Sequence, residues 1–163
     1  LIRAIESKAG ATSMVDYIDL APLNFSFLNG LFRSFERIRW LKLHIFFKPA
    51  QGTTFGGQVS YGVDYTFRKS SLDRAGIASL TPNRSHSLWV DSTSQPLVVP
   101  PKMLQSRAWY TDLGVANTAS MDNDSAPGRL CIAASHAKAT DAVPLGEVWA
   151  RYEVILAGTR PAE

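Results

Sequence analysis

With 163 residues, 45% of them hydrophobic, the chain is long enough for one domain with its own core and short for two. Charged residues make up 19% and the formal net charge is +3, so charge permits a nucleic-acid partner without requiring one. Cys131 is the only cysteine, which excludes an internal disulfide and a zinc site built on paired cysteines. No apolar run approaches the roughly 18 residues of a membrane span, so no membrane partner is expected.

Eight segments have the composition and length of β-strands. They are rich in β-branched and aromatic residues, and clusters containing Pro, Gly or Asn separate many of them. In chain order the expected strands are Leu1–Lys8, Tyr17–Leu20, Arg37–Phe47, Val59–Phe67, Ser85–Asp91, Pro96–Val99, Arg129–Ser135 and Val148–Leu156. Helical signals are short and predict a turn capped by Asn24 and running to Phe35, a helix within Ser71–Leu80 and another over Met103–Arg107.

The strongest strand signals are two segments with a strict period of two, Val59–Phe67 and Val148–Leu156, the second opened by Gly146. In Arg37–Phe47 the apolar positions change parity between Trp40 and Leu41. One extra residue inserted into a strand causes such a slip, so a β-bulge is predicted there.

Many short strands with regular turns and few helices are typical of two packed sheets. The sequence therefore predicts an all-β fold, an eight-stranded antiparallel jelly-roll sandwich with short connecting helices, formed by residues 1–163 as a single domain.

Catalytic signatures are missing from the sequence. The three histidines, His44, His86 and His136, are scattered, and neither a Gly-x-Ser-x-Gly nor a His-Glu-x-x-His motif occurs. The Gly52–Gly57 segment contains no Gly-Lys-Ser/Thr motif of a phosphate-binding loop, and it joins two expected strands instead of a strand and a helix. We therefore expect no enzymatic activity, no catalytic residue, no metal ligand and no cofactor.

Basic residues gather at one place, Arg33, Arg37, Arg39 and Lys42, opposed only by Glu36 and interleaved with Trp40. Cations next to aromatic rings can bind phosphates and stack on bases. A solvated strand face with ordinary ion pairing would have the same composition, and both interpretations stay open.

The order of several short motifs is more informative than any one of them. These are a strand ending in a proline (Tyr17–Pro22), the basic strand Arg37–Lys48, Pro49–Thr54, Gly56–Val59, an apolar strand into Pro100–Pro101, Arg107–Tyr110 and the final Gly146–Leu156. In this order they resemble the shell domain of coat proteins from small icosahedral positive-strand RNA plant viruses of the tombusvirus, sobemovirus and ourmiavirus kind. The resemblance covers nearly the whole chain.

This resemblance implies a jelly roll whose identical subunits self-assemble into an icosahedral shell around viral RNA, held without sequence specificity. It implies location in the virion and assembly in the host cytoplasm. It also implies a basic N-terminal arm upstream, which would explain why the chain does not begin with Met. Arg33, Arg37, Arg39 and Lys42 become candidates for an RNA-facing patch.

Related coat proteins often bind calcium between subunits through closely spaced aspartates. Here Asp64 is followed by Arg68 and Lys69, a departure that argues against such a site, and Asp122-Asn123-Asp124 is a second acidic candidate. Two other functions fit the same architecture: a cellular ligand-binding module of the lectin or carbohydrate-binding type, and a cupin-type enzyme, which needs a cluster of histidines and carboxylates.

Overall fold

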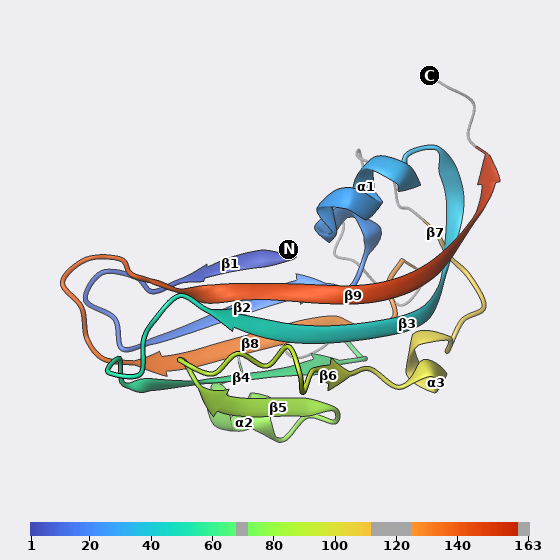
Figure 1. Ribbon diagram of the computed structural model, residues 1–163. Coiled ribbons are helices and arrows are strands. Elements are labelled where there is room, and N and C mark those ends of the chain that lie inside the picture. The colour runs from blue at the N-terminus through green and yellow to red at the C-terminus, as the bar shows by residue number, and fades with distance from the viewer. Residues whose placement is uncertain (68–71, 112–124, 160–163) are drawn as a thin grey trace.

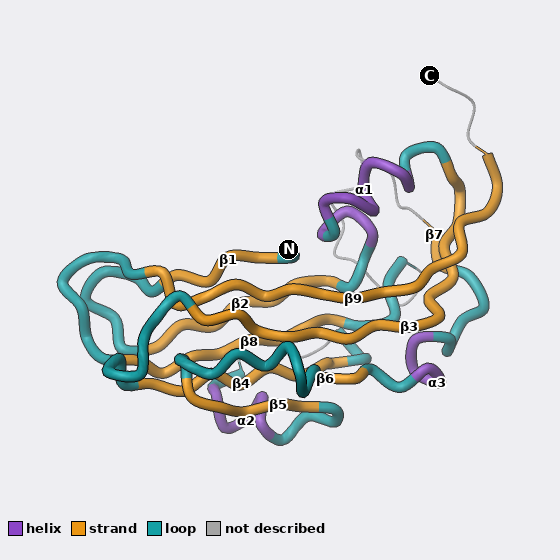
Figure 2. The backbone as a smooth tube through the Cα atoms, viewed as in Figure 1, coloured by secondary structure: helices purple, strands orange, loops and turns teal. Residues whose placement is uncertain are grey.

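Two antiparallel sheets face each other in the computed structural model, which describes residues 1–67, 72–111 and 125–159 (Figures 1 and 2). The first, here the β3–β9 sheet, contains β1 (Arg3–Glu6), β9 (Pro144–Thr159), β3 (Phe35–Pro49), β6 (Leu97–Val98) and β7 (Tyr110–Thr111). The second, the β4–β8 sheet, contains β2 (Ser13–Asp19), β8 (Arg129–His136), β4 (Gly57–Asp64) and β5 (Asn83–Ser87).

Two short strands, β6 and β7, lie one after the other along the same edge of β3 and together form one edge strand of the β3–β9 sheet. β6 pairs with β3 at His44 and Ile45, and β7 pairs with it at Arg37 and Ile38. Between them the chain forms α3 (Pro101–Leu104) (Figure 2). Each sheet therefore has four strand positions, ordered β1-β9-β3-β6/β7 and β2-β8-β4-β5. Strands at successive positions along the chain alternate between the sheets, except that β4 and β5 follow each other and pair within one sheet. This is an eight-position jelly roll, as predicted.

The core lies between the two sheets and consists of large side chains from both. Its largest fully buried members include Trp40 and Phe47 of β3, Tyr61 of β4, Tyr110 of β7 and Ile18 of β2. A smaller buried cluster lies on the outer side of the β4–β8 sheet, where α2 (Arg74–Ala78) places Ile77 against Cys131 and Ala133. The outer faces of the two sheets thus differ, because a helix packs against one of them.

The predicted bulge in β3 is confirmed. Trp40 pairs with Val154 of β9 and Lys42 pairs with the next residue along, Glu153, so Leu41 is the extra residue. As a result Ile38 and Trp40 before the bulge and Leu43, Ile45 and Phe47 after it all point into the core, where each is buried.

Several strand boundaries differ from those predicted. β4 ends at Asp64 instead of Phe67, because the Asp64 carboxylate accepts the N–H of Thr66 in a local turn and Phe67 has a left-handed φ of 55°. β2 begins earlier than predicted, at Ser13, and β5 lies earlier, ending at Ser87. β1 and β6 are shorter than predicted, and β7 was not predicted, since two residues carry no periodic signal.

The predicted helices are present but short. Asn24 does not cap the first: it ends a 3-10 turn, η1 (Pro22–Asn24), and its side chain donates to the carbonyl of Asp19. α1 (Ser26–Phe32) follows with Phe25 at its N-cap position. α2 begins after Asp73, whose carboxylate accepts the N–H of Gly76 as an N-cap.

Candidate nucleic-acid interface

The bulge in β3 decides which basic side chains share a face. Arg37 and Arg39 alternate with buried Ile38 and Trp40, so both point away from the core. If β3 alternated strictly through Leu41 with no bulge, Lys42 would point inward with the core residues. With the bulge, Lys42 lies between Leu41 and buried Leu43 and joins the two arginines outside. The structure therefore brings Arg37, Arg39 and Lys42 together on the outward face of the β3–β9 sheet.

These three cations have little local acid to neutralise them. Their partners across β9 are Ala157, Ile155 and, for Lys42, Glu153. In the described part of the chain none of the three forms a salt bridge. The buried Nε of Arg39 also has no hydrogen-bond partner there. A row of unneutralised cations on a sheet attracts anions.

Aromatic rings accompany the cations on this face. The guanidinium of Arg37 lies 5.1 Å from the ring centroid of Trp109, and Trp109 is half-buried just before β7. Farther along the sheet, the ammonium of Lys48 lies 4.7 Å from the ring of Trp149, and the guanidinium of Arg151 lies 5.1 Å from the ring of Phe46. Such pairs hold a cation and a flat apolar ring side by side.

The candidate site includes four further residues that the sequence did not predict: Lys48, Arg151, Phe46 and Trp149. The signal was available: Trp149 and Arg151 occupy the parity opposite to buried Val148 in a strand that was predicted. Their neighbours in space, Phe46 and Lys48, could not be assigned, because only the register of β3 against β9 shows that Phe46 pairs with Trp149.

The pKa of His44 is affected by the positive charges on this face. His44 pairs with Arg151 across β9 and lies one outward position beyond Lys42. Partial desolvation lowers the pKa of His44 below its ordinary value, and the positive charges of Lys42 and Arg151 lower it further. Glu153 acts in the opposite direction without reversing the shift.

Arg33 lies apart from this row. It is exposed at the C-cap of α1, and the segment before it packs on the core side of the sheet, where Phe25 contacts the inward-facing rings of Trp40 and Tyr152 at centroid distances of 5.3 Å each. Its place among the predicted RNA-facing residues stays a prediction.

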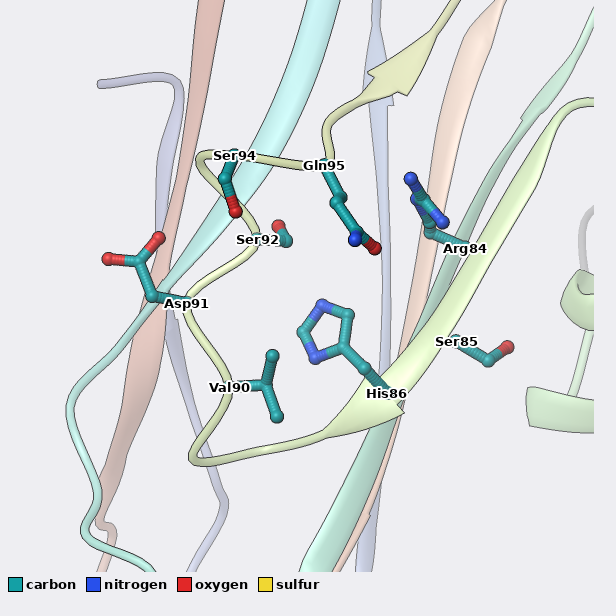
Figure 3. A pocket seen from close by; sticks show the side chains of 8 residues that line it. All are labelled: Arg84, Ser85, His86, Val90, Asp91, Ser92, Ser94 and Gln95. Carbon is teal, nitrogen blue, oxygen red and sulfur yellow. The ribbon is translucent and has the colours of Figure 1, made fainter.

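A small pocket of about 290 Å³ lies beside β5 and offers a second candidate (Figure 3). Arg84, His86, Asp91, Ser92 and Gln95 are among its lining residues. His86 is already engaged: its Nε2 lies 3.1 Å from the hydroxyl of Tyr61 and its Nδ1 2.8 Å from the carbonyl oxygen of Ser87. A histidine held in this way serves the structure, and the pocket gathers no nucleophile with a free base.

Metal ligands do not converge in the parts of the chain that the structure describes, where no group of three His, Cys, Asp or Glu side chains could hold an ion. The carboxylate of Asp64 accepts hydrogen bonds from both the N–H and the hydroxyl of Thr66. Arg68, Lys69 and the Asp122–Asp124 segment lie outside the described residues. None of the described helices has the length and hydropathy needed to cross a membrane.

Comparison with known proteins identifies the family. Residues 4–162 match the viral coat protein (S domain) family, and the chain belongs to it. No curated protein sequence matches the chain.

Solved structures agree on the fold. A structure of tobacco necrosis virus superposes with a TM-score of 0.82 at 19% identity, covering 99% of this chain and 80% of that one. A structure of Cocksfoot mottle virus superposes with a TM-score of 0.81 at 14% identity, covering 98% of this chain and 81% of that one. A structure of Melon necrotic spot virus superposes with a TM-score of 0.77 at 22% identity, covering 98% of this chain and 53% of that one. The protein is thus a structural capsid subunit, found in the virion as one of many identical copies, and the ligand-binding alternative is not favoured.

Proposed function

We propose that the outward face of the β3–β9 sheet lines the inside of an icosahedral shell and holds viral RNA through charge, without reading its sequence. The observation that carries this proposal is the row formed by Arg37, Arg39 and Lys42, three cations on one face with no salt bridge in the described structure. Phosphates would supply the missing negative charge, and a phosphate contact carries no sequence information.

Each subunit would bind weakly. Three neutralised phosphates correspond to a slope of about −2 in a plot of log affinity against log salt for single-stranded RNA. A shell presents the same face many times to one long RNA, so the contacts add as linked binding events. The cation–aromatic pairs of Lys48 with Trp149 and of Arg151 with Phe46 would extend the path of the RNA along the sheet.

The same proposal includes a single shell domain formed by residues 1–163, assembly in the host cytoplasm and no catalytic activity of this chain. This chain would act through its surfaces. The pocket beside β5 holds no nucleophile with a free base, and no described group of His, Cys, Asp or Glu side chains could hold a metal ion. Elemental analysis that finds stoichiometric iron, zinc or manganese would revive the cupin-type enzyme.

The direct test measures RNA binding by residues 1–163 after Arg37, Arg39 and Lys42 are all changed to Ala. Affinity should fall alike for oligonucleotides of unrelated sequence, and the salt slope should flatten by about 2. The matched control changes Lys8, Lys102 and Lys138 to Ala, three exposed lysines outside β3 and β9, which removes the same charge from other places.

Equal losses in the two triple variants would mean that RNA responds to net charge and not to this face. Unchanged binding by a correctly folded Arg37, Arg39 and Lys42 variant would mean that the face is an outer surface or a subunit contact. Either result would contradict the proposal.

A further inference from the structure

Three large apolar side chains are exposed next to one another in the chain around α1. Phe27 is 73% exposed and Leu31 is 45% exposed, and the two lie one turn apart on the same side of the helix. Leu23 in the preceding η1 turn is 49% exposed. We call Leu23, Phe27 and Leu31 the α1 patch.

The neighbouring side of α1, about 100° around the helix, is apolar as well, and it packs into the core of its own subunit. Leu28 and Phe32 are 1% and 5% exposed and belong to the main core. The two pairs are adjacent in sequence, Phe27–Leu28 and Leu31–Phe32, so α1 has two neighbouring apolar stripes about 100° apart, and Ser26, Asn29 and Gly30 occupy the rest of its surface. A surface helix ordinarily has one apolar stripe, which faces the core, so a second and exposed apolar stripe is unusual.

The segment has no charge that would favour exposure to water. From Leu20 to Phe32 the sequence contains no Asp, Glu, Lys or Arg. Figure 1 shows α1 at the end of the sandwich where β3 begins and β9 ends, projecting beyond the layers of strands. An exposed apolar patch in such a place marks an interaction site.

We propose that a second copy of this chain covers the α1 patch in the assembled shell. Membership of the coat protein family indicates what covers the patch, because a coat protein packs against other copies of itself. An uncharged patch fits another copy well, since burying it leaves no unpaired charge at the centre of the contact. This inference rests on membership of the coat protein family and is independent of the proposed RNA face.

The first test is assembly of the Phe27→Ser/Leu31→Ser double variant, followed by light scattering or sedimentation over a range of protein concentration. Losing an aromatic anchor from an interface raises the concentration needed for assembly by about tenfold or more. Phe27→Leu keeps an apolar side chain at this position and should assemble close to the parent concentration. Thermal unfolding of the unassembled double variant should match that of the parent.

Leu28→Ala is the matched comparison from the buried side of the same helix, and it should lower the unfolding temperature of the unassembled subunit. A double variant that assembles at the parent concentration overturns the proposal. So does a double variant that unfolds as early as Leu28→Ala, because the patch would then be covered by its own chain.

Hydroxyl-radical footprinting provides a readout without mutation. Oxidation of Phe27 should fall several-fold when subunits enter particles. Equal oxidation in subunits and particles would show that no copy covers the ring, and the proposal would be wrong.

Discussion

At the scale of single residues, the best-defined polar feature is a hydrogen-bonded chain that joins the two sheets beside the pocket of Figure 3. The N–H of Phe47 in β3 donates to the Ser92 hydroxyl at 2.7 Å, and Ser92 lies 2.8 Å from the hydroxyl of Tyr61 in β4. Tyr61 in turn reaches Nε2 of His86 at 3.1 Å. Because the carbonyl of Ser87 can only accept, Nδ1 of His86 carries the proton and Nε2 accepts from Tyr61.

We predict that Tyr61→Phe costs about 1–3 kcal/mol in the free energy of unfolding, measured by denaturant titration near pH 7.5. The substitution keeps the ring in the core and removes the hydroxyl. Ser92 and His86 each lose the hydrogen bond that they make with this hydroxyl. Tyr110→Phe is the control from another buried ring, whose hydroxyl meets only the hydroxyl of Ser106 among the described residues, and it should cost less. Equal costs would contradict the role of the hydrogen-bonded chain.

The same chain predicts how stability depends on pH. Burial lowers the pKa of His86, and nearby Arg84 acts in the same direction, so the folded protein favours the neutral ring. The unfolded chain takes up a proton near pH 6.5, so this stability is fully present above that pH and is lost as the pH falls through the folded pKa. His44 is shifted in the same direction.

To separate the two histidines, denaturant unfolding is measured between pH 7.5 and 4.5 for the parent, His86→Gln and His44→Gln. The His86→Gln variant should be less stable than the parent at pH 7.5, and the gap should narrow as the pH falls. A gap that stays constant over this range would exclude His86 as a source of the pH dependence.

At the scale of elements, the sequence predicted what depends on periodicity and missed what depends on distant pairing. Alternation and its slip predicted β3, its bulge, and the core face of β9. The bulge then determined where Lys42 points, which alternation alone could not settle. Which apolar residues of α1 are buried and which are exposed could not be predicted from periodicity. Phe27, Leu28, Leu31 and Phe32 all have helical spacing, and only the packing against the sheets shows which pair is buried.

The bulge gives a prediction about deletions. Removing Leu41 leaves a regular alternation from Ile38 through Trp40 to Leu43, so the fold should survive with a loss of about 1–2 kcal/mol for one half-buried side chain. Removing Arg39 instead forces either Ile38 or Trp40 out of the core and should cost about 3–5 kcal/mol. The midpoints of denaturant unfolding measure the loss of stability in each of the two deletion variants. Similar losses in both deletions would mean that Leu41 is not the inserted residue.

At the scale of the whole molecule, the two sheets have different outer faces. The β4–β8 sheet is overlaid by α2, with Ile77 buried against Cys131 and Ala133. The β3–β9 sheet presents the cations of β3 together with Lys48 and Arg151, opposed on the same face by two acids of β9, Glu147 and Glu153. The composition does not show this asymmetry, because a formal net charge of +3 says nothing about which cations share a face.

Ultraviolet cross-linking of RNA inside intact particles shows directly whether the β3–β9 face of the shell subunit contacts RNA. Mass spectrometry of the cross-linked peptides should find them in the segments containing Arg37–Lys48 and Trp149–Arg151. Few should come from the β4–β8 sheet or α2. Cross-links concentrated in β4, β8 or α2, with none in β3 or β9, would show that RNA contacts another face of the subunit.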